Sequence, residues 1–144
     1  MKKIKLLATC ILATFTLVSC SNNASLYHDL NSAGDSIVRF VNGTFSAELY
    51  NTSLQSVYNA TLLALNNSNI YGVKNNTINS QHAEITGTYA TDKNFFNKSG
   101  KDSFAIRLVK DNKDTINLFI KIGELGDKQA SVDLLANIQT NLGI

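Results

Sequence analysis

The chain has 144 residues, a formal net charge of +2 at pH 7, two Cys, no Pro and no Trp. This length predicts a single domain. Three of the 13 basic residues lie within the first five positions, so the rest of the chain is slightly acidic. That balance gives no reason to expect binding to nucleic acid or a polybasic contact with a membrane.

The first twenty residues have the form of a secretory leader. A basic N-terminus, Met1-Lys2-Lys3-Ile4-Lys5, precedes an apolar run from Leu6 to Val18. That run is shorter than the roughly 20 apolar residues that a membrane-spanning helix needs. It ends in the motif Leu17-Val18-Ser19-Cys20, and the chain turns polar immediately afterwards.

An aliphatic residue at −3, small residues near the cut and a Cys at +1 resemble the lipobox of bacterial lipoprotein precursors. The resemblance implies that a signal peptide, residues 1–19, is removed and that Cys20 carries a thioether-linked diacylglycerol and an acylated amine. Two or three acyl chains hold a protein stably at a bilayer. Ser21 stands where an Asp typically causes inner-membrane retention, so the resemblance implies the outer membrane, facing either the periplasm or the exterior.

Two other interpretations of the leader stay open: an ordinary signal peptide with an accidental Cys, and a transmembrane anchor. In the lipoprotein interpretation Cys10 leaves with the leader and Cys20 carries lipid, so the mature domain keeps no thiol for a disulfide. Its stability must then come from a hydrophobic core. Residues 20–34 are small and polar and predict a lipidated tether with a reach of roughly 20 Å, followed by one domain over residues 35–144.

The domain begins with a strand and a helix. Residues 35–50 read as one strand, because apolar Phe45, Ala47 and Leu49 alternate with polar residues, and Gly43 marks a bulge or bend. Residues 53–66 have the apolar spacing of an amphipathic helix. Thr52 and Gln55 have the form of a capping box at its start.

Four strands and a second helix follow. The strands are expected at residues 69–75, 78–89, 103–109 and 115–122, with a turn at Asn75-Asn76 and a hairpin joining the last two strands. The second helix is expected at residues 128–141, with Asp127 as its N-cap and Gly143 after its end. One-sided helices and alternating strands predict an α+β domain of two layers, with about five mostly antiparallel strands in the sheet and both helices on one face.

Three segments resemble a family of small bacterial lipoproteins of unassigned function, over roughly residues 38–142. They are Val41-Asn42-Gly43-Thr44-Phe45, residues 57–65 (Val-Tyr-Asn-Ala-Thr-Leu-Leu-Ala-Leu) and residues 120–127 (Ile-Lys-Ile-Gly-Glu-Leu-Gly-Asp). The resemblance implies the same order of elements and a lipidated Cys20. It implies no catalytic, cofactor-binding or metal-binding residue. Residues 91–102 look longer than the family's pattern.

Motifs for catalysis are weak. The turn Gly123-Glu124-Leu125-Gly126-Asp127 lacks the residues of a phosphate loop, so turn geometry and capping explain it better than anion binding. His82 and Glu84 share one face of a strand, but no Pro-Cys-x-x-Cys follows as a zinc deaminase requires. We therefore expect no enzyme, no cofactor and no metal.

Two adjacent aromatic residues, Phe95 and Phe96, lie in a polar and basic segment; either one of them packs under the edge of the sheet, or both are candidates for partner contact. The preferred hypothesis is a non-catalytic envelope lipoprotein that acts as a structural or protein-interaction module at the outer membrane, with an envelope protein as its partner. The alternative is a lipid- or glycan-binding lipoprotein that uses a groove between its helices and its sheet. The polar face of the sheet is a further candidate surface.

Overall fold

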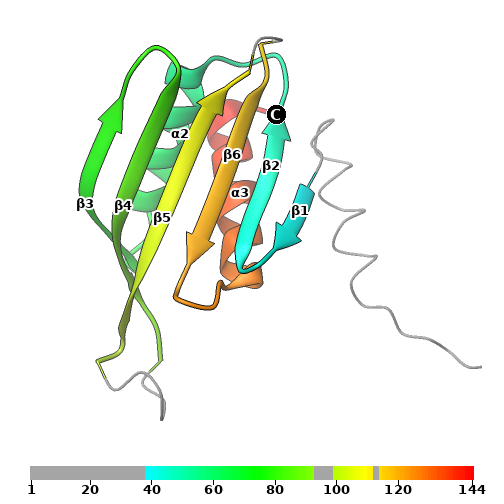
Figure 1. Cartoon of the computed structure of the whole chain (residues 1–144). Helices are drawn as coiled ribbons and strands as arrows, with labels where there is room; N and C mark the ends of the chain where they lie inside the picture. The colour runs from blue at the N-terminus through cyan, green and yellow to red at the C-terminus, as the bar shows by residue number, and fades with distance from the viewer. Residues whose placement is uncertain (1–37, 93–98, 112–113) are drawn as a thin grey trace, which may run out of the picture.

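The computed structural model describes residues 38–92, 99–111 and 114–144. These form two layers, a twisted six-stranded sheet with two helices packed on one of its faces (Figure 1). The leader, Cys20 and the predicted tether lie outside the described residues, as do Phe95 and Phe96. The predicted fold class and element order are confirmed, with six strands in place of five.

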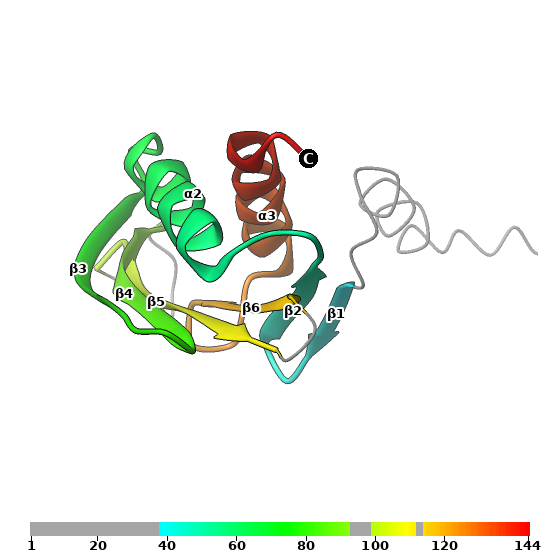
Figure 2. The ribbon, with the colours of Figure 1, turned by 90° about the horizontal axis from the view of Figure 1, so that it is seen from above.

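The elements follow one another along the chain in a simple order. They are β1 (Val38–Val41), β2 (Thr44–Leu49), α2 (Leu54–Asn66), β3 (Tyr71–Ile78), β4 (His82–Ala90), β5 (Lys101–Lys110), β6 (Ile116–Ile122) and α3 (Lys128–Leu142). The strand order is β1-β2-β6-β5-β4-β3 and every neighbouring pair is antiparallel. Both helices lie on the same face, as predicted, and the sheet curves around them (Figure 2).

The core fills the space between the helices and the sheet. Alternate residues of β6, from Ile116 to Ile122, are fully buried there, and they meet Leu65 of α2 and Leu135 of α3 in one cluster. No buried side-chain nitrogen or oxygen of the described residues lacks a hydrogen-bond partner. The burial of the large aliphatic side chains of this cluster, each contributing roughly 1.5–3 kcal/mol, holds the two layers together.

The first predicted strand is wrong in one respect, because it is a hairpin. Asn42 and Gly43 both have positive φ, 51° and 75°, and form a two-residue turn between β1 and β2. That turn matches the twist of the flanking strands and favours Asn-Gly. Gly43 is therefore a turn residue and not a bulge in one continuous strand.

The predicted turn at Asn75-Asn76 is also wrong, because both residues lie inside β3. Asn76 is held there by the Tyr58 hydroxyl of α2, which donates a hydrogen bond to its Oδ1 at 2.8 Å. The chain turns instead after Asn79, whose Oδ1 accepts hydrogen bonds from the backbone N–H groups of Gln81 and His82 at 2.9 Å. The turn is thus made by an Asn side chain, and β3, which precedes it, is eight residues long.

The helix ends agree with the sequence pattern more closely. Ser53, not Thr52, caps α2, because its extended backbone lets its side chain accept from the N–H of Ser56. Asp127 caps α3 as predicted, accepting from the N–H of Ala130 at 2.9 Å, and Gly143 ends it with a φ of 77°. Of the described helices, neither is long and apolar enough to cross a membrane.

Candidate functional site

The face of the sheet opposite the helices, called here the open face, carries the outward-pointing residues of all six strands. Strand alternation sends every second side chain to this face while its neighbours enter the core. Most of these residues are small or polar, among them Thr44, Ser46, Asn75, Thr86, Thr88, Ser103, Ala105 and Asn117. Both described helices lie on the other side (Figures 1 and 2).

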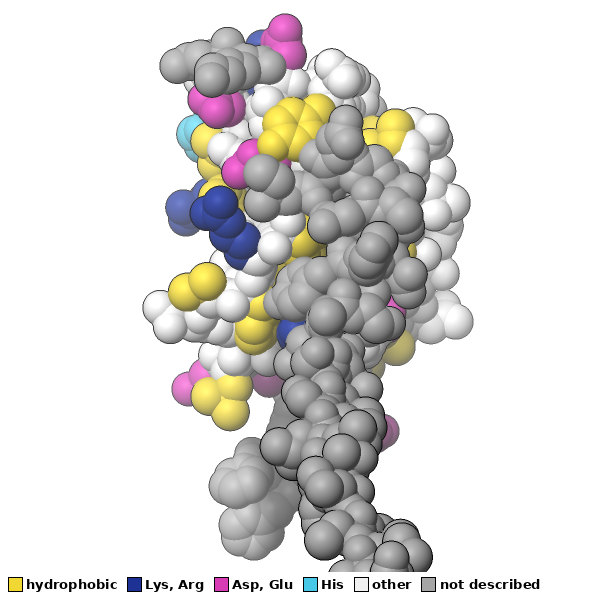
Figure 3. Space-filling model, turned by 90° about the vertical axis from the view of Figure 1, so that its right-hand side faces the viewer, with side chains coloured by type: hydrophobic (Ala, Val, Ile, Leu, Met, Phe, Trp, Pro, Cys, Tyr) yellow, Lys and Arg dark blue, Asp and Glu magenta, His cyan; other side chains and the backbone are white. Residues whose placement is uncertain are grey.

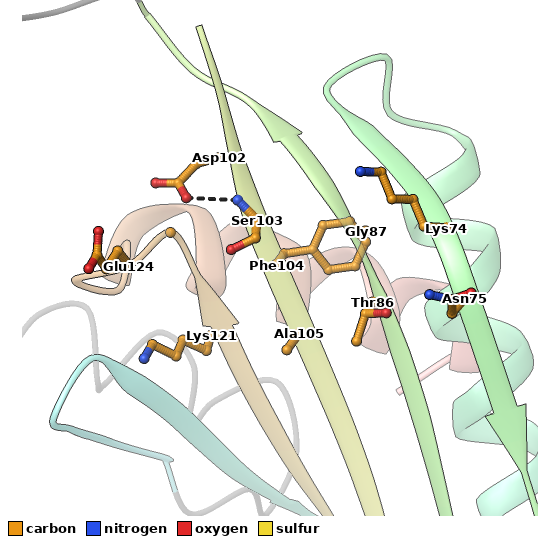
Figure 4. A pocket seen from close by; sticks show the side chains of 11 residues that line it. Lys74, Asn75, Thr86, Gly87, Asp102, Ser103, Phe104, Ala105, Lys121 and Glu124 are labelled. Carbon is orange, nitrogen blue, oxygen red and sulfur yellow. Dashed lines mark hydrogen bonds between the residues drawn. The ribbon is translucent and has the colours of Figure 1, made fainter. Parts of the chain in front are cut away.

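Three adjoining hollows cross the open face. The largest, of about 540 Å³, reaches from Lys74 on β3 to Lys121 on β6 (Figure 4). The second, of about 400 Å³, shares Thr86, Ala105 and Lys121 with the first. The third, of about 200 Å³, lies towards β1 and shares Phe119 with the second. Together they make one shallow trough that runs across the strands.

Phe119 stands in the middle of this trough. It is the half-buried aromatic residue of β6 that points away from the core. Ladder pairing places it in one row with Arg39 of β1, Ser46 of β2 and Arg107 of β5. Directly opposed residues on one sheet face have Cβ atoms about 5 Å apart, so the ring lies beside the side chain of Arg107.

Arg107 also pairs with Glu84 across the β4–β5 ladder, at 3.2 Å between Nε and Oε1. Both side chains remain well exposed, at 63 % and 49 %. An exposed pair of this kind contributes at most about 1 kcal/mol. The pair therefore orients the guanidinium without removing it from solvent.

Charge is unevenly divided between the two sides of the domain. Five basic residues point outward from the strands of the open face, Arg39, Lys74, Lys101, Arg107 and Lys121, against two acidic residues, Glu48 and Glu84. Elsewhere, the described chain has two basic residues, Lys110 and Lys128, against seven acidic ones, Asp92, Asp102, Asp111, Asp114, Glu124, Asp127 and Asp133. In Figure 3, basic side chains gather on the left-hand side, where the open face is seen edge-on. The outward-pointing strand residues are thus mainly basic, whereas the trough as a whole is lined by four basic and four acidic residues, because Asp102 and Glu124 border its largest hollow.

Two carboxylates border the largest hollow at the end where β6 leaves the sheet. Asp102 Oδ1 accepts a hydrogen bond from the Ser103 N–H at 2.7 Å, and Glu124 lies in the loop after β6 (Figure 4). Such groups can bind polar ligands by hydrogen bonds and charge. Among the described residues, no group of three or more His, Cys, Asp and Glu side chains is arranged to hold a metal ion.

Comparison with known protein families gives one match. The model of a family described as a protein of unknown function, DUF3568, matches residues 3–141. This chain belongs to the DUF3568 family. The matched region takes in most of the predicted leader, Cys20 and nearly the whole described domain. A search of curated proteins found no match.

The structure describes none of the site residues predicted for this DUF3568 chain, whereas it does describe the weak motif of His82 and Glu84. Cys20, Phe95 and Phe96 lie outside the described residues. His82 and Glu84 share the open face, but His82 contacts Asn79 and Glu84 pairs with Arg107, so different neighbours engage them. The row through Phe119 was missed, although an aromatic residue at an outward position of a predicted strand could have indicated it.

A separate hollow, of about 230 Å³, lies where α3 meets β3 and β4. Burial raises the pKa of the Tyr71 hydroxyl, and the charges of Asp127 and Asp133 raise it further. The Tyr89 hydroxyl donates a long hydrogen bond of 3.4 Å to Asp127 Oδ2. This volume is below the roughly 300–1,000 Å³ of typical small-molecule pockets.

Proposed function

We propose that this chain is a non-catalytic bacterial envelope lipoprotein that acts as a structural or protein-interaction module at the outer membrane. Acyl chains on Cys20 anchor it, residues 20–34 form the tether, and the open face of the sheet contacts an envelope protein. The leader and the lipobox support lipidation at Cys20, and Ser21 supports location at the outer membrane. The observation that carries the role is a hollowed sheet face, lined by polar and charged side chains, on a domain whose other face is covered by helices.

The chemistry of the described residues supports a role in binding rather than catalysis. Within the trough, Glu84 is engaged by Arg107, and Glu48 accepts a hydrogen bond of 2.6 Å from the Tyr50 hydroxyl. Asp102 accepts from a backbone N–H. These groups lie on an open surface and are engaged by neighbouring donors, which favours a surface that binds a partner.

A lipid or glycan between the helices and the sheet is the weaker candidate. The interior between the two layers is filled by aliphatic side chains, and the hollow beside α3 is small. A lipid acyl chain would need an apolar cavity in that position. The open face, with its larger hollows, is the better-supported binding surface.

Site-specific photo-crosslinking in living cells tests this proposal. A photoreactive residue at Ala105, exposed on the open face, should yield a discrete adduct with another envelope protein. The same residue at Ala136, exposed on α3, is the matched control and should yield none. Absence of an adduct at Ala105, or equal adducts at both positions, would contradict a role for the open face.

A further inference from the structure

We infer that the partner of the open face presents a carboxylate-bearing protein segment that lies across the strands, over the row formed by Arg39, Phe119 and Arg107. The inference rests on the proposed function and narrows it, because it names the chemistry of the partner. It depends on three observations, which are the charge of the face, the spacing of the row and the shape of the trough.

The charge of the face favours an anionic occupant. The two hollows that flank Phe119 are lined by three basic residues, Arg39, Arg107 and Lys121, and by two acidic ones, Glu48 and Glu84. Among the described residues, neither Arg39 nor Lys121 forms an ion pair. Glu84 and Glu48 are already engaged, by Arg107 and the Tyr50 hydroxyl. Carboxylates on a partner would therefore find cations available for pairing, and Arg binds carboxylates through two parallel hydrogen bonds.

The spacing of the row fits an extended segment. Adjacent strands lie about 4.8 Å apart, so Arg39 and Phe119, two strands apart, are separated by about 10 Å, and Arg39 and Arg107 by about 14 Å. An extended peptide advances about 3.3 Å per residue. Side chains at positions i, i+2 and i+4 of an extended peptide share one face. Two acidic residues four positions apart, about 13 Å, would thus meet Arg39 and Arg107, and an apolar residue midway between them would face the row near Phe119.

The shape of the trough favours a protein segment over other anions. A bilayer surface is flat, whereas this face is hollowed on both sides of Phe119. A polysaccharide would gain from a platform of several exposed rings, whereas the row offers Phe119 alone. Arg and aromatic residues are enriched at the centres of protein interfaces. Asp102 and Glu124 repel anions at one end of the largest hollow and direct the segment towards Phe119.

A labelled peptide tests the inference with the purified full chain. The probe contains two copies of the pattern Glu-Ser-Leu-Ser-Glu, and a control peptide carries Gln for each Glu. Fluorescence anisotropy at low salt should show binding of the Glu peptide only. The double variant R39Q/R107Q should weaken that binding at least about tenfold. The variant K110Q/K128Q, which removes the same charge from outside the open face, should change it less than about twofold.

Parallel arms with wild-type chain identify other occupants. They use phosphatidylglycerol vesicles, polygalacturonate, and sedimentation of the chain alone for self-association through its acidic side. Stronger binding to vesicles or to polygalacturonate than to the Glu peptide, or self-association in place of peptide binding, would overturn the inference. So would equal losses in R39Q/R107Q and K110Q/K128Q. Thermal melts of both variants verify that they fold, and R39K/R107K, which keeps both charges, should retain more binding than R39Q/R107Q.

Crosslinking separates this inference from the proposed function. The adduct at Ala105 should disappear in the R39Q/R107Q background and persist in K110Q/K128Q. If the adduct persists in R39Q/R107Q, the open face is still an interaction surface, but these arginines do not determine which partner binds to it. If Ala105 gives no adduct in the wild-type chain, the proposed function itself fails.

Discussion

Gly43 and Gly126 pack backbone against backbone, and their contact joins the β1–β2 turn to the loop that enters α3. A Cβ built on Gly126 would overlap the carbonyl oxygen of Gly43, and one built on Gly43 would overlap the carbonyl oxygen of Leu125. Both glycines also have positive φ, 75° and 83°. The turn between the edge strand β1 and β2 is thus fixed to the start of α3 through two residues that need to be glycine.

The variant Gly126→Ala should therefore be strongly destabilised. The added methyl group meets backbone atoms that cannot move aside, and the left-handed conformation strains any residue with a Cβ. We expect a loss of about 2–4 kcal/mol in the free energy of unfolding, measured by urea denaturation. Gly143→Ala is the control, because that position has a similar φ but no atom within 4 Å of its Cβ, and should lose only about 1 kcal/mol. Equal losses would show that the contact with Gly43 adds nothing.

Tyr58 and Asn76 should be energetically coupled. Their hydrogen bond links α2 to the part of β3 that a turn was expected to occupy. Tyr58→Phe keeps the ring in the core and should lose about 1 kcal/mol of unfolding free energy. A double-mutant cycle with Asn76→Ala should give a coupling energy of similar size. Strict additivity of the two substitutions would mean that the bond does not stabilise β3.

Local patterns predicted the fold wherever burial decides structure. The alternation around Phe45 and along β6 identified the strands, because a half-buried strand needs an apolar residue at every second position. Asp127 and Gly143 marked the ends of α3 through capping chemistry that is local in sequence. The same patterns placed both helices on one face.

The errors concern turns, which depend on backbone conformation and on distant partners. Asn42-Gly43 carried a strong hairpin signal, but the strand-like pattern on both sides of it suggested one long strand with Gly43 at a bulge or bend. Asn75-Asn76 looked like a turn because Asn is common in turns. The hydrogen bond that holds Asn76 within β3 comes from Tyr58, 18 residues away, which a local pattern does not reveal. The outward position of Phe119 was visible in the sequence, but its neighbours in the row were not, since they depend on the registers of β1, β2, β6 and β5.

Stability should fall at high pH, and Tyr71 should account for part of the loss. Burial raises the pKa of Tyr71 in the folded chain above the value of about 10 expected when unfolded. The unfolded chain therefore loses this proton first as the pH rises above about 10, and folding stability decreases from there upwards. Urea denaturation at pH 9 and at pH 11 should show a smaller decrease for Tyr71→Phe than for the wild type. A decrease of the same size in both chains would contradict the assignment.

The lipid anchor leads to a further prediction. Cys20→Ala should abolish incorporation of labelled fatty acid and leave an uncut precursor in the inner membrane, because the acceptor sulfur is gone. Cys10→Ala is the matched control, since that Cys lies within the predicted leader, and it should label like the wild type. Label that persists in Cys20→Ala would show that the acyl chains, if present, are attached elsewhere.

Intact-mass spectrometry of the protein isolated from its own cells is the most direct measurement of the central claim, that acyl chains at one sulfur hold this domain at the envelope. The mass should correspond to a chain that begins at Cys20 and carries a diacylglycerol with or without a further acyl group. A mass that retains residues 1–19, or one with an unmodified Cys20, would contradict the anchor and the outer-membrane role together.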